Sequence, residues 1–303
     1  MKIIRIINRG ERYRKALESI WKPIMEHLPK DSYIVEESGY DSNKKIWLNE
    51  KNKKYFNIGF FSDISERHEM FICHGAADKN YRYTKKLKLF DNICVTGNLW
   101  KEKLIKQGIE EKRIKVVGYP KLDDLFTKKK IKHTDGKIHV LYAPTHNVNP
   151  TLQNTKTISS YPRLNRNISN LDKNAKFEVI TSCHPINNEN NITSDLLLWA
   201  DVVVSDSGSL IYESWSMDLP VVFPDWLVSE NISSSFKGTF EQQIYQQGIG
   251  YHAKKPNDFK STVLRAYEDG ISSKSKIFIE GIFPRELRGV SGLVTAEEIL
   301  KLI

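Results

Sequence analysis

Residues 200–225 read ADVVVSDSGSLIYESWSMDLPVVFPD and hold two apolar runs separated by a polar turn and a helical pattern. The runs, residues 202–204 and 221–223, are short and rich in valine, as strands buried in a parallel sheet are. Between them, the apolar side chains of residues 210–215 recur with the spacing of a helix. The sequence therefore predicts a strand–turn–helix–strand unit, and in parallel sheets ligands bind beside such strand-end turns.

The turn at residues 205–209 contains three serines, one aspartate and one glycine. It directly precedes the predicted helix, where unpaired N–H groups and the positive end of the helix dipole favour a phosphate. The alternative is simple capping of this helix by Asp206 or Ser207, which is common at helix N-termini. We interpret the turn as a phosphate or nucleotide site, because other parts of the chain point to the same chemistry.

The composition is that of a globular protein with more than one domain. The chain has 303 residues, of which 40% are hydrophobic and 27% charged, and this length favours two domains. No run approaches the roughly 20 apolar residues of a membrane span, and no signal-peptide pattern opens the sequence. The three cysteines form no CxxC pair, which argues against zinc and against a disulfide framework, so a protein of the reducing cytoplasm is expected.

The chain is basic, with a net charge of +9 and a pI near 9.2. Lysines gather at residues 85–88 and 128–132. A basic protein favours an anionic partner, here a phosphate-bearing substrate or an anionic membrane surface. No motif of a nucleic-acid-binding fold is present, so nucleic acid is not an expected partner. The plain alternative for each lysine run is a solvated face or linker.

Predicted strands alternate with helical patterns along both halves of the chain. They lie at residues 2–7, 32–36, 69–73, 93–95, 114–117, 138–142, 178–181, 202–204 and 221–223. This alternation predicts an α/β protein of two Rossmann-like parallel-sheet domains that face a central cleft. The charged, aperiodic residues 128–136 are the best linker, so we predict domains 1–130 and 131–303, with the last helix packing back toward the first domain. Residues 229–238 are expected to form a mobile loop.

Three histidines directly follow predicted strands: His74, His146 and His184. A single histidine at a strand end is usually a structural group, but three in equivalent places favour a role in the cleft. Small residues beginning with Gly75 follow His74, and Lys79 and Arg82 add positive charge nearby. This combination suits an imidazole base beside an anionic reactant.

Two acidic residues near the polar turn could contact a ligand. Glu213 lies two helical turns after Asp206, so both carboxylates are expected on one side of the helix, where they would accept hydrogen bonds from ribose or glycol hydroxyls. A solvent-facing Glu213 is the alternative.

The absence of GxGxxG, GxxxxGK[ST] and GxSxG argues against a dehydrogenase, a P-loop NTPase and an α/β-hydrolase. No carboxylate pair suits Mg²⁺ on a diphosphate, so neither a metal nor a cofactor is predicted, and cationic side chains with a helix N-terminus would neutralise the phosphates.

Five short motifs occur in a fixed order: His74-Gly75, GYPKLD at residues 118–123, YAPT at 142–145, His184-Pro185 and DSGS at 206–209. Together they resemble the CDP-glycerol glycerophosphotransferase family of teichoic-acid and capsule synthesis. The chain departs from that family in its DSGS turn, which is nearer to the loop of UDP-N-acetylglucosamine 2-epimerases. It also has His146-Asn147 where the family tends to have Trp-Arg.

The resemblance implies a GT-B fold, with the acceptor in the N-terminal half and the nucleotide in the C-terminal half. It implies transfer of glycerol phosphate from CDP-glycerol to a hydroxyl of a glycan or lipid-linked acceptor, with release of CMP. The lysine runs are expected to hold such an enzyme at the inner face of the cell membrane. The expected catalytic residues are His74 and His184, and acceptor or phosphate contacts are expected from Gly75, Lys79 and Arg82. The expected donor-binding residues are Thr145, His146, Asp206, Ser207, Gly208, Ser209 and Glu213. A ribitol-phosphate transferase, a sugar-nucleotide epimerase or glycosyltransferase, and a basic binding protein for an anionic glycan or membrane remain alternatives.

Overall fold

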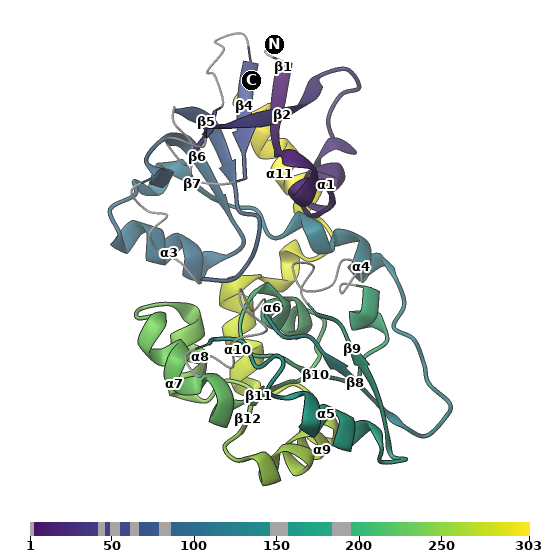
Figure 1. Cartoon of the computed structure of the whole chain (residues 1–303). Helices are drawn as coiled ribbons and strands as arrows, with labels where there is room; N and C mark the ends of the chain where they lie inside the picture. Colours follow the sequence, from purple (N-terminus) through teal and green to yellow (C-terminus); the bar gives the residue numbers. More distant parts are fainter. Residues whose placement is uncertain are drawn as a thin grey trace. The chain divides into compact units, whose positions relative to one another are not determined.

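The computed structural model describes residues 3–41, 46–48, 55–60, 67–78, 86–145, 157–183 and 195–303 (Figure 1). They form two compact units. Unit 1 contains Met1–Ala76, Tyr81–Thr127 and Glu280–Ile303, and unit 2 contains Ala77–Asn80 and Lys128–Ile279. Each unit is built on a mainly parallel sheet with helices, so the predicted α/β architecture of two Rossmann-like sheets is confirmed. No helix in the described ranges has the length and apolarity that crossing a bilayer requires.

Unit 1 has a seven-stranded sheet in the order β3-β2-β1-β4-β5-β6-β7. All neighbouring strands are parallel except β2 and β3. The strands are β1 (Ile3–Arg9), β2 (Tyr33–Asp41), β3 (Ile46–Leu48), β4 (Tyr55–Gly59), β5 (His68–Ile72), β6 (Phe90–Val95) and β7 (Ile114–Val116). The helices are α1 (Gly10–Met25), α3 (Asn98–Lys106), α4 (Asp123–Thr127) and α11 (Ser291–Leu300).

The C-terminal helix α11 packs in unit 1 against α1, where Figure 1 shows the two helices in yellow and purple. Both helices contribute to one apolar cluster with β1, β4 and β5, which includes Leu17, Ile58 and Ile299. The helices approach so closely that a Cβ atom on Gly292 would lie 2.6 Å from the carbonyl oxygen of Pro23. Only glycine therefore fits this position without a shift of the backbone.

The GYPKLD segment, singled out above as a family motif, holds the start of α11. Gly118 has φ +83°, and a Cβ atom there would lie 2.2 Å from Ser291 Oγ. The backbone N–H of Tyr119 donates to that same hydroxyl oxygen over 2.9 Å. The carboxylate of Asp123 accepts hydrogen bonds from the backbone N–H groups of Ser291 and Gly292, at 3.1 and 2.6 Å. The motif thus stabilises the first turn of α11.

Asp123 makes the stability of unit 1 depend on pH. Burial raises the pKa of its carboxyl group above the usual 3.8, and the N–H groups of Gly292 and Ser291 oppose this only in part. The folded protein then binds this proton more tightly than the unfolded chain, so the contribution of Asp123 to stability falls as the pH rises above 3.8. Asp123→Asn does not titrate. We therefore expect the free energy of unfolding of the wild type, relative to this variant, to decrease from pH 3.5 upward in urea titrations; a constant or rising difference would contradict the assignment.

Unit 2 has a five-stranded parallel sheet in the order β12-β11-β10-β8-β9. The strands are β8 (Ile138–Tyr142), β9 (Phe177–Thr181), β10 (Val202–Val204), β11 (Val221–Pro224) and β12 (Tyr251–Ala253). The helices are α5 (Asn165–Asp172), α6 (Ser209–Ser216), α7 (Asp225–Ser235), α8 (Phe240–Gln247) and α9 (Phe259–Asp269), and α10 (Ser273–Ile282) begins in this unit. Helices α5 and α9 pack with the central strands in one apolar cluster.

Most of residues 229–238 are helical, so the expected mobile loop is wrong. Helix α7 continues to Ser235 because Val228 and Ile232 are buried. Packing of an apolar face outweighs the weak helix propensity of the serines in its last turn.

Candidate active site

The strand order of unit 2 places a topological switch point between β8 and β10. The chain leaves β8 toward β9 on one side, whereas β10 continues toward β11 and β12 on the other side. In open parallel sheets the crevice outside the carboxyl ends of two such strands is the usual ligand site. Here those ends are Ala143–Thr145 after β8 and the polar turn 205–209 after β10.

Asp206 organises this switch point. Its carboxylate accepts hydrogen bonds from the backbone N–H groups of Thr145 (2.8 Å), Ser160 (2.7 Å) and Ser207 (2.7 Å), and from the hydroxyl of Ser160 (2.7 Å). Tyr245 donates its hydroxyl hydrogen to the Asp206 carbonyl oxygen over 2.6 Å. Asp206 is fully buried. Its side chain therefore holds three segments of the site together, including Thr145, another predicted donor-binding residue.

The N-terminus of α6 lies in the same turn and has no side-chain cap. Its N-cap residue is Gly208, with φ +108°, a left-handed conformation that favours glycine. The N-cap position is thus occupied by Gly208, which has no side chain, and not by Asp206 or Ser207, the alternative that we considered. Ser207 is 3% exposed, and within the described ranges no hydrogen-bond partner lies near its Oγ atom. An uncapped helix start beside an unsatisfied hydroxyl is suited to an anionic ligand.

Two further predicted residues belong to α6. Ser209, the first residue of the helix, accepts a hydrogen bond at Oγ from the backbone N–H of Ala77 over 3.4 Å. Glu213 lies one turn later and is 2% exposed, so the alternative of a solvent-facing side chain is wrong. A carboxyl group buried this deeply requires polar partners, which makes Glu213 part of the packed interior around the turn.

Unit 1 places His74 just beyond the carboxyl end of β5. Its Nδ1 atom lies 2.7 Å from the carbonyl oxygen of Phe60, which follows the neighbouring strand β4. A carbonyl oxygen only accepts hydrogen bonds, so Nδ1 carries the proton and Nε2 is the basic nitrogen. Tyr119 donates its hydroxyl hydrogen to the His74 carbonyl oxygen over 3.2 Å, and Cys73 donates to the carbonyl of Gly75 over 2.8 Å. This half-buried imidazole is held in an orientation suited to a general base.

Four predicted site residues lie outside the described residues: His146, His184, Lys79 and Arg82. Their assignments stay predictions.

Arg163 is a site residue that the sequence did not reveal. Its guanidinium donates to the carbonyl oxygens of Ser159 (3.2 Å) and Leu227 (2.7 Å). Burial lowers the pKa of Arg163, and the nearby Asp206 carboxylate acts in the opposite direction. The sequence could not place Arg163 near Asp206. Ser160 and Asp206 are 46 residues apart, and only the hydrogen bonds of the folded chain bring this loop to Asp206.

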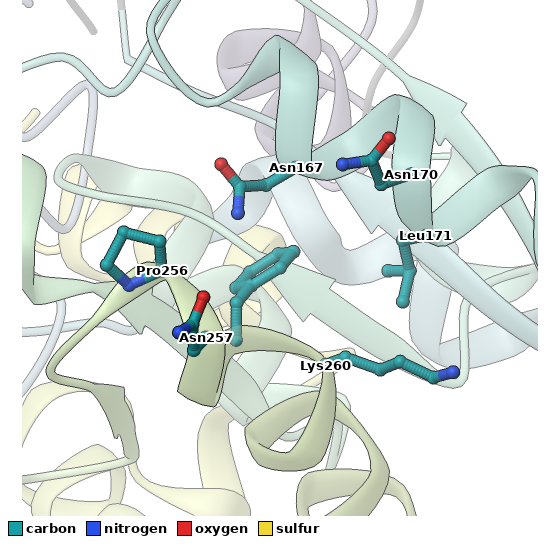
Figure 2. A pocket seen from close by; sticks show the side chains of 7 residues that line it. Asn167, Asn170, Leu171, Pro256, Asn257 and Lys260 are labelled. Carbon is teal, nitrogen blue, oxygen red and sulfur yellow. The ribbon is translucent and has the colours of Figure 1, made fainter.

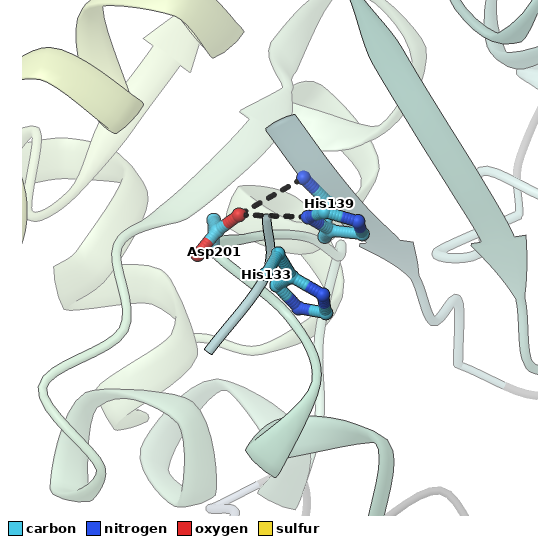
Figure 3. A group of neighbouring side chains, drawn as sticks. All are labelled: His133, His139 and Asp201. Carbon is cyan, nitrogen blue, oxygen red and sulfur yellow. Dashed lines mark hydrogen bonds and ion pairs between the residues drawn. The ribbon is translucent and has the colours of Figure 1, made fainter. Parts of the chain in front are cut away.

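A histidine cluster lies at the other end of the unit 2 sheet, near the start of β8 and β10. Figure 3 shows His133, His139 and Asp201, whose ligand atoms lie within 4.8 Å of one another. The two nitrogens of His139 face carboxylate oxygens of Asp201 and Asp135, both at 3.2 Å, and its ring stacks on that of His133 at 3.3 Å. His133 Nε2 donates to the Trp199 carbonyl over 2.7 Å. These contacts tie the linker to the sheet.

A shallow hollow of about 200 Å³ lies between α5 and the start of α9 (Figure 2). Its lining is Asn167, Asn170, Leu171, Pro256, Asn257, Phe259 and Lys260. It shares no residue with the turn at the switch point, and its lining contains none of the predicted site residues. We therefore place the candidate site at the switch point.

No protein-family model and no curated protein sequence matches this chain. Among solved structures, the wall teichoic acid polymerase TagF matches with a TM-score of 0.62 at 13% identity, over 98% of this chain and 88% of that chain. UDP-GlcNAc 2-epimerase from Methanocaldococcus jannaschii matches with a TM-score of 0.57 at 12% identity, over 100% of both chains. The S. aureus MnaA–UDP co-structure matches with a TM-score of 0.56 at 12% identity, over 100% of this chain and 98% of that chain. At such identities the likeness concerns the fold alone, and this fold is a GT-B-like α/β fold.

Proposed function

We propose that this protein is a nucleotide-dependent GT-B enzyme that transfers glycerol phosphate from CDP-glycerol to a hydroxyl group of a glycan or lipid-linked acceptor. The observation that carries the proposal is the uncapped N-terminus of α6 at the switch point, with the unsatisfied hydroxyl of Ser207 beside it. This arrangement supports a diphosphate ligand. The ordered motifs of the sequence support the cytidine nucleotide and the teichoic-acid or capsule pathway.

Several solved structures of similar fold contain a nucleotide ligand, which supports a nucleotide donor. One structure of a TagF variant was obtained with CDPG, MnaA was solved with UDP, and the M. jannaschii epimerase was solved with UDP-GlcNAc and UDP. A sugar-nucleotide epimerase or glycosyltransferase is the second candidate function. It is favoured by the DSGS turn and by the epimerase folds, which match over nearly their full length.

In the proposed reaction the acceptor hydroxyl attacks the glycerol-bearing phosphorus of CDP-glycerol. His74 Nε2 takes the hydroxyl proton as the new P–O bond forms. The bond to the leaving phosphate breaks with its electron pair on the oxygen of CMP. The N-terminus of α6 and Ser207 would stabilise the negative charge on the diphosphate. Ser209 and Glu213 are proposed to bind the donor, and His184, His146, Lys79 and Arg82 keep their predicted roles as proposals.

A donor panel tests this assignment. The protein is incubated with CDP-glycerol, CDP-ribitol, UDP-N-acetylglucosamine and other UDP-sugars, and release of CMP or UDP is followed with a mixed glycan acceptor. CMP release from CDP-glycerol supports the proposal, and CMP release from CDP-ribitol alone supports a ribitol-phosphate transferase. UDP release or epimerised UDP-sugar would favour the second candidate. Binding of glycan without turnover of any donor would indicate a binding protein.

Ser207→Ala is expected to weaken binding of CDP about 10- to 150-fold, since a hydrogen bond to a charged group contributes about 1.5–3 kcal/mol. The same change should leave the melting temperature unchanged or raise it, because the hydroxyl it removes is buried without a partner in the described structure. Ser214→Ala is the matched control: its hydroxyl donates to the Leu210 carbonyl in the same helix over 2.7 Å. Titration calorimetry measures both, and equal CDP affinities in the two variants would remove Ser207 from the donor site.

The lysine run at residues 128–132 supports an anionic membrane surface as a further proposed partner. Lys129 and Lys132 are exposed, whereas Lys128 and Lys130 pair with Asp195 and Asp201. Each exposed lysine contributes about 1 kcal/mol to binding an anionic bilayer. Binding to phosphatidylserine vesicles, measured by co-sedimentation, should weaken as the salt concentration rises. Binding that does not change with salt concentration would contradict this proposal.

A further inference from the structure

Residues Ala77 and Asp78 pack in unit 2 against the N-terminal ends of α6 and α8. The backbone N–H of Asp78 donates to both carboxylate oxygens of Glu241, at 2.9 and 3.2 Å. In return, the backbone N–H of Phe240 donates to Asp78 Oδ2 over 2.9 Å. Asp78 is 1% exposed and Glu241 is fully buried. The pair forms a reciprocal hydrogen-bonded clamp, which we call the Asp78–Glu241 clamp.

The clamp has the hydrogen-bond pattern of a capping box, but its two residues come from distant parts of the chain. In a capping box the cap side chain accepts from a helix N–H, and a glutamate of the first turn accepts from the N–H of the cap residue. Here Asp78 and Glu241 are 163 residues apart. Helix α8 already has a local cap, since Thr239 Oγ1 accepts from the N–H of Gln242 over 3.2 Å. The second cap from Asp78 is therefore not needed only to start α8.

The clamp also reaches α6. Tyr212, one turn into that helix, donates its hydroxyl hydrogen to Glu241 Oε1 over 3.0 Å. Burial first, and then the Glu241 and Asp78 carboxylates, raise the pKa of Tyr212 well above its ordinary value, which keeps the hydroxyl protonated as a donor. Ala77 adds the hydrogen bond to Ser209 Oγ. The segment 77–78 is thereby fixed to the first turn of the helix that carries the proposed donor site.

We propose that the Asp78–Glu241 clamp is a positioning element of the enzyme, and that Asp78 and Glu241 are positioning residues for the transfer reaction. This inference rests on the proposed function. The clamp orders the first turn of α6, where the donor diphosphate would bind. In the sequence, the clamp segment follows the proposed base closely, since Ala77 comes three residues after His74. Loss of the clamp should therefore affect both donor binding and turnover.

The test compares two variants. Asp78→Ala removes the carboxylate that accepts from the Phe240 N–H and opens that side of the clamp, although the Asp78 N–H can still donate to Glu241. Thr239→Ala removes the other cap of α8 and leaves both sides of the clamp intact. Both variants should lower the melting temperature. Only Asp78→Ala is expected to lower kcat/KM for CDP-glycerol by about 100-fold, since small displacements of aligned groups have effects of that order. Most of the loss should appear in kcat, with a few-fold rise in KM for the donor. Asp78→Asn keeps an oxygen that can accept from the Phe240 N–H, so this variant should retain most of the activity. It provides the comparison if the alanine variant does not fold.

Hydrogen exchange gives a readout that does not depend on the donor. Asp78→Ala should increase amide exchange of residues 207–211 at least 10-fold, whereas Thr239→Ala should leave these amides protected. If the wild type turns over no donor of the panel, the proposed function fails and the exchange result alone decides whether the clamp orders α6. If the two variants show the same exchange and the same kinetic loss, the clamp is only a helix cap and the inference is overturned.

Discussion

Replacing His74 with alanine is expected to lower kcat of the transfer reaction by about 10²–10⁴-fold, the contribution of a positioned general base. The structure gives the reason. Nδ1 is engaged as a donor to the Phe60 carbonyl over 2.7 Å, which leaves Nε2 as the nitrogen that accepts a proton. The affinity for CDP should change little, because the residues proposed to hold the nucleotide belong to unit 2. Steady-state kinetics and calorimetry with CDP measure the two effects separately.

His74→Asn tests the base role of Nε2 separately from the hydrogen bond that Nδ1 makes. The Asn side-chain amide nitrogen takes the place of Nδ1 and keeps the hydrogen bond to Phe60, but no group replaces Nε2. We expect this variant to be as inactive as the alanine variant while melting near the wild-type temperature. His27→Ala removes an exposed histidine of the same unit and should retain full activity. A nearly active His74→Asn would show that the imidazole is structural and would move the base to another residue.

The strands that the sequence predicted best are the valine-rich ones of unit 2. β10 and β11 are buried along their whole length, and such strands appear as uninterrupted apolar runs. β4 gave no such pattern because Asn57 interrupts it. This asparagine is fully buried, and both its backbone N–H and its side chain donate to Glu69, at 2.9 and 2.8 Å. A polar residue satisfied by a distant partner looks like a loop residue in the sequence.

The sequence likewise predicted some parts of the candidate site and missed others. The turn 205–209 and the histidine after β5 were visible, because residue type and position after a strand are local properties. The clamp was not visible, because Asp78 and Glu241 are ordinary acidic residues until the fold brings them together. The role of Asp206 was visible only in part. Its residue type suggested a ligand contact, whereas its hydrogen bonds to residues 145 and 160 show a carboxylate that organises the site from within.

Asp206→Ala should have the largest effect on stability. The carboxylate accepts four hydrogen bonds from the groups of Thr145, Ser160 and Ser207, and all of these residues are at least 95% buried. Its removal leaves buried N–H groups without acceptors, at about 1–3 kcal/mol for each unsatisfied group. We expect a loss of about 3–5 kcal/mol in the free energy of unfolding, a large part of the about 5–15 kcal/mol that stabilises a typical domain. Urea unfolding of the protein measures this loss.

Two further variants show whether the loss in free energy of unfolding comes from the hydrogen bonds that Asp206 accepts at the switch point. Asp206→Asn keeps one oxygen but turns an NH₂ group toward donors, so it should lose nearly as much stability as the alanine variant. Asp195→Asn removes a carboxylate of the same unit that is 54% exposed and pairs with Lys128, and exposed pairs contribute only about 0–1 kcal/mol. Since Ser207 N–H is one of the groups held by Asp206, both Asp206 variants should also lose CDP binding under conditions where they remain folded. A stable Asp206→Ala protein that still binds CDP would mean that Thr145 and the turn keep their places without the carboxylate, and the candidate site would then lack the scaffold on which its geometry rests.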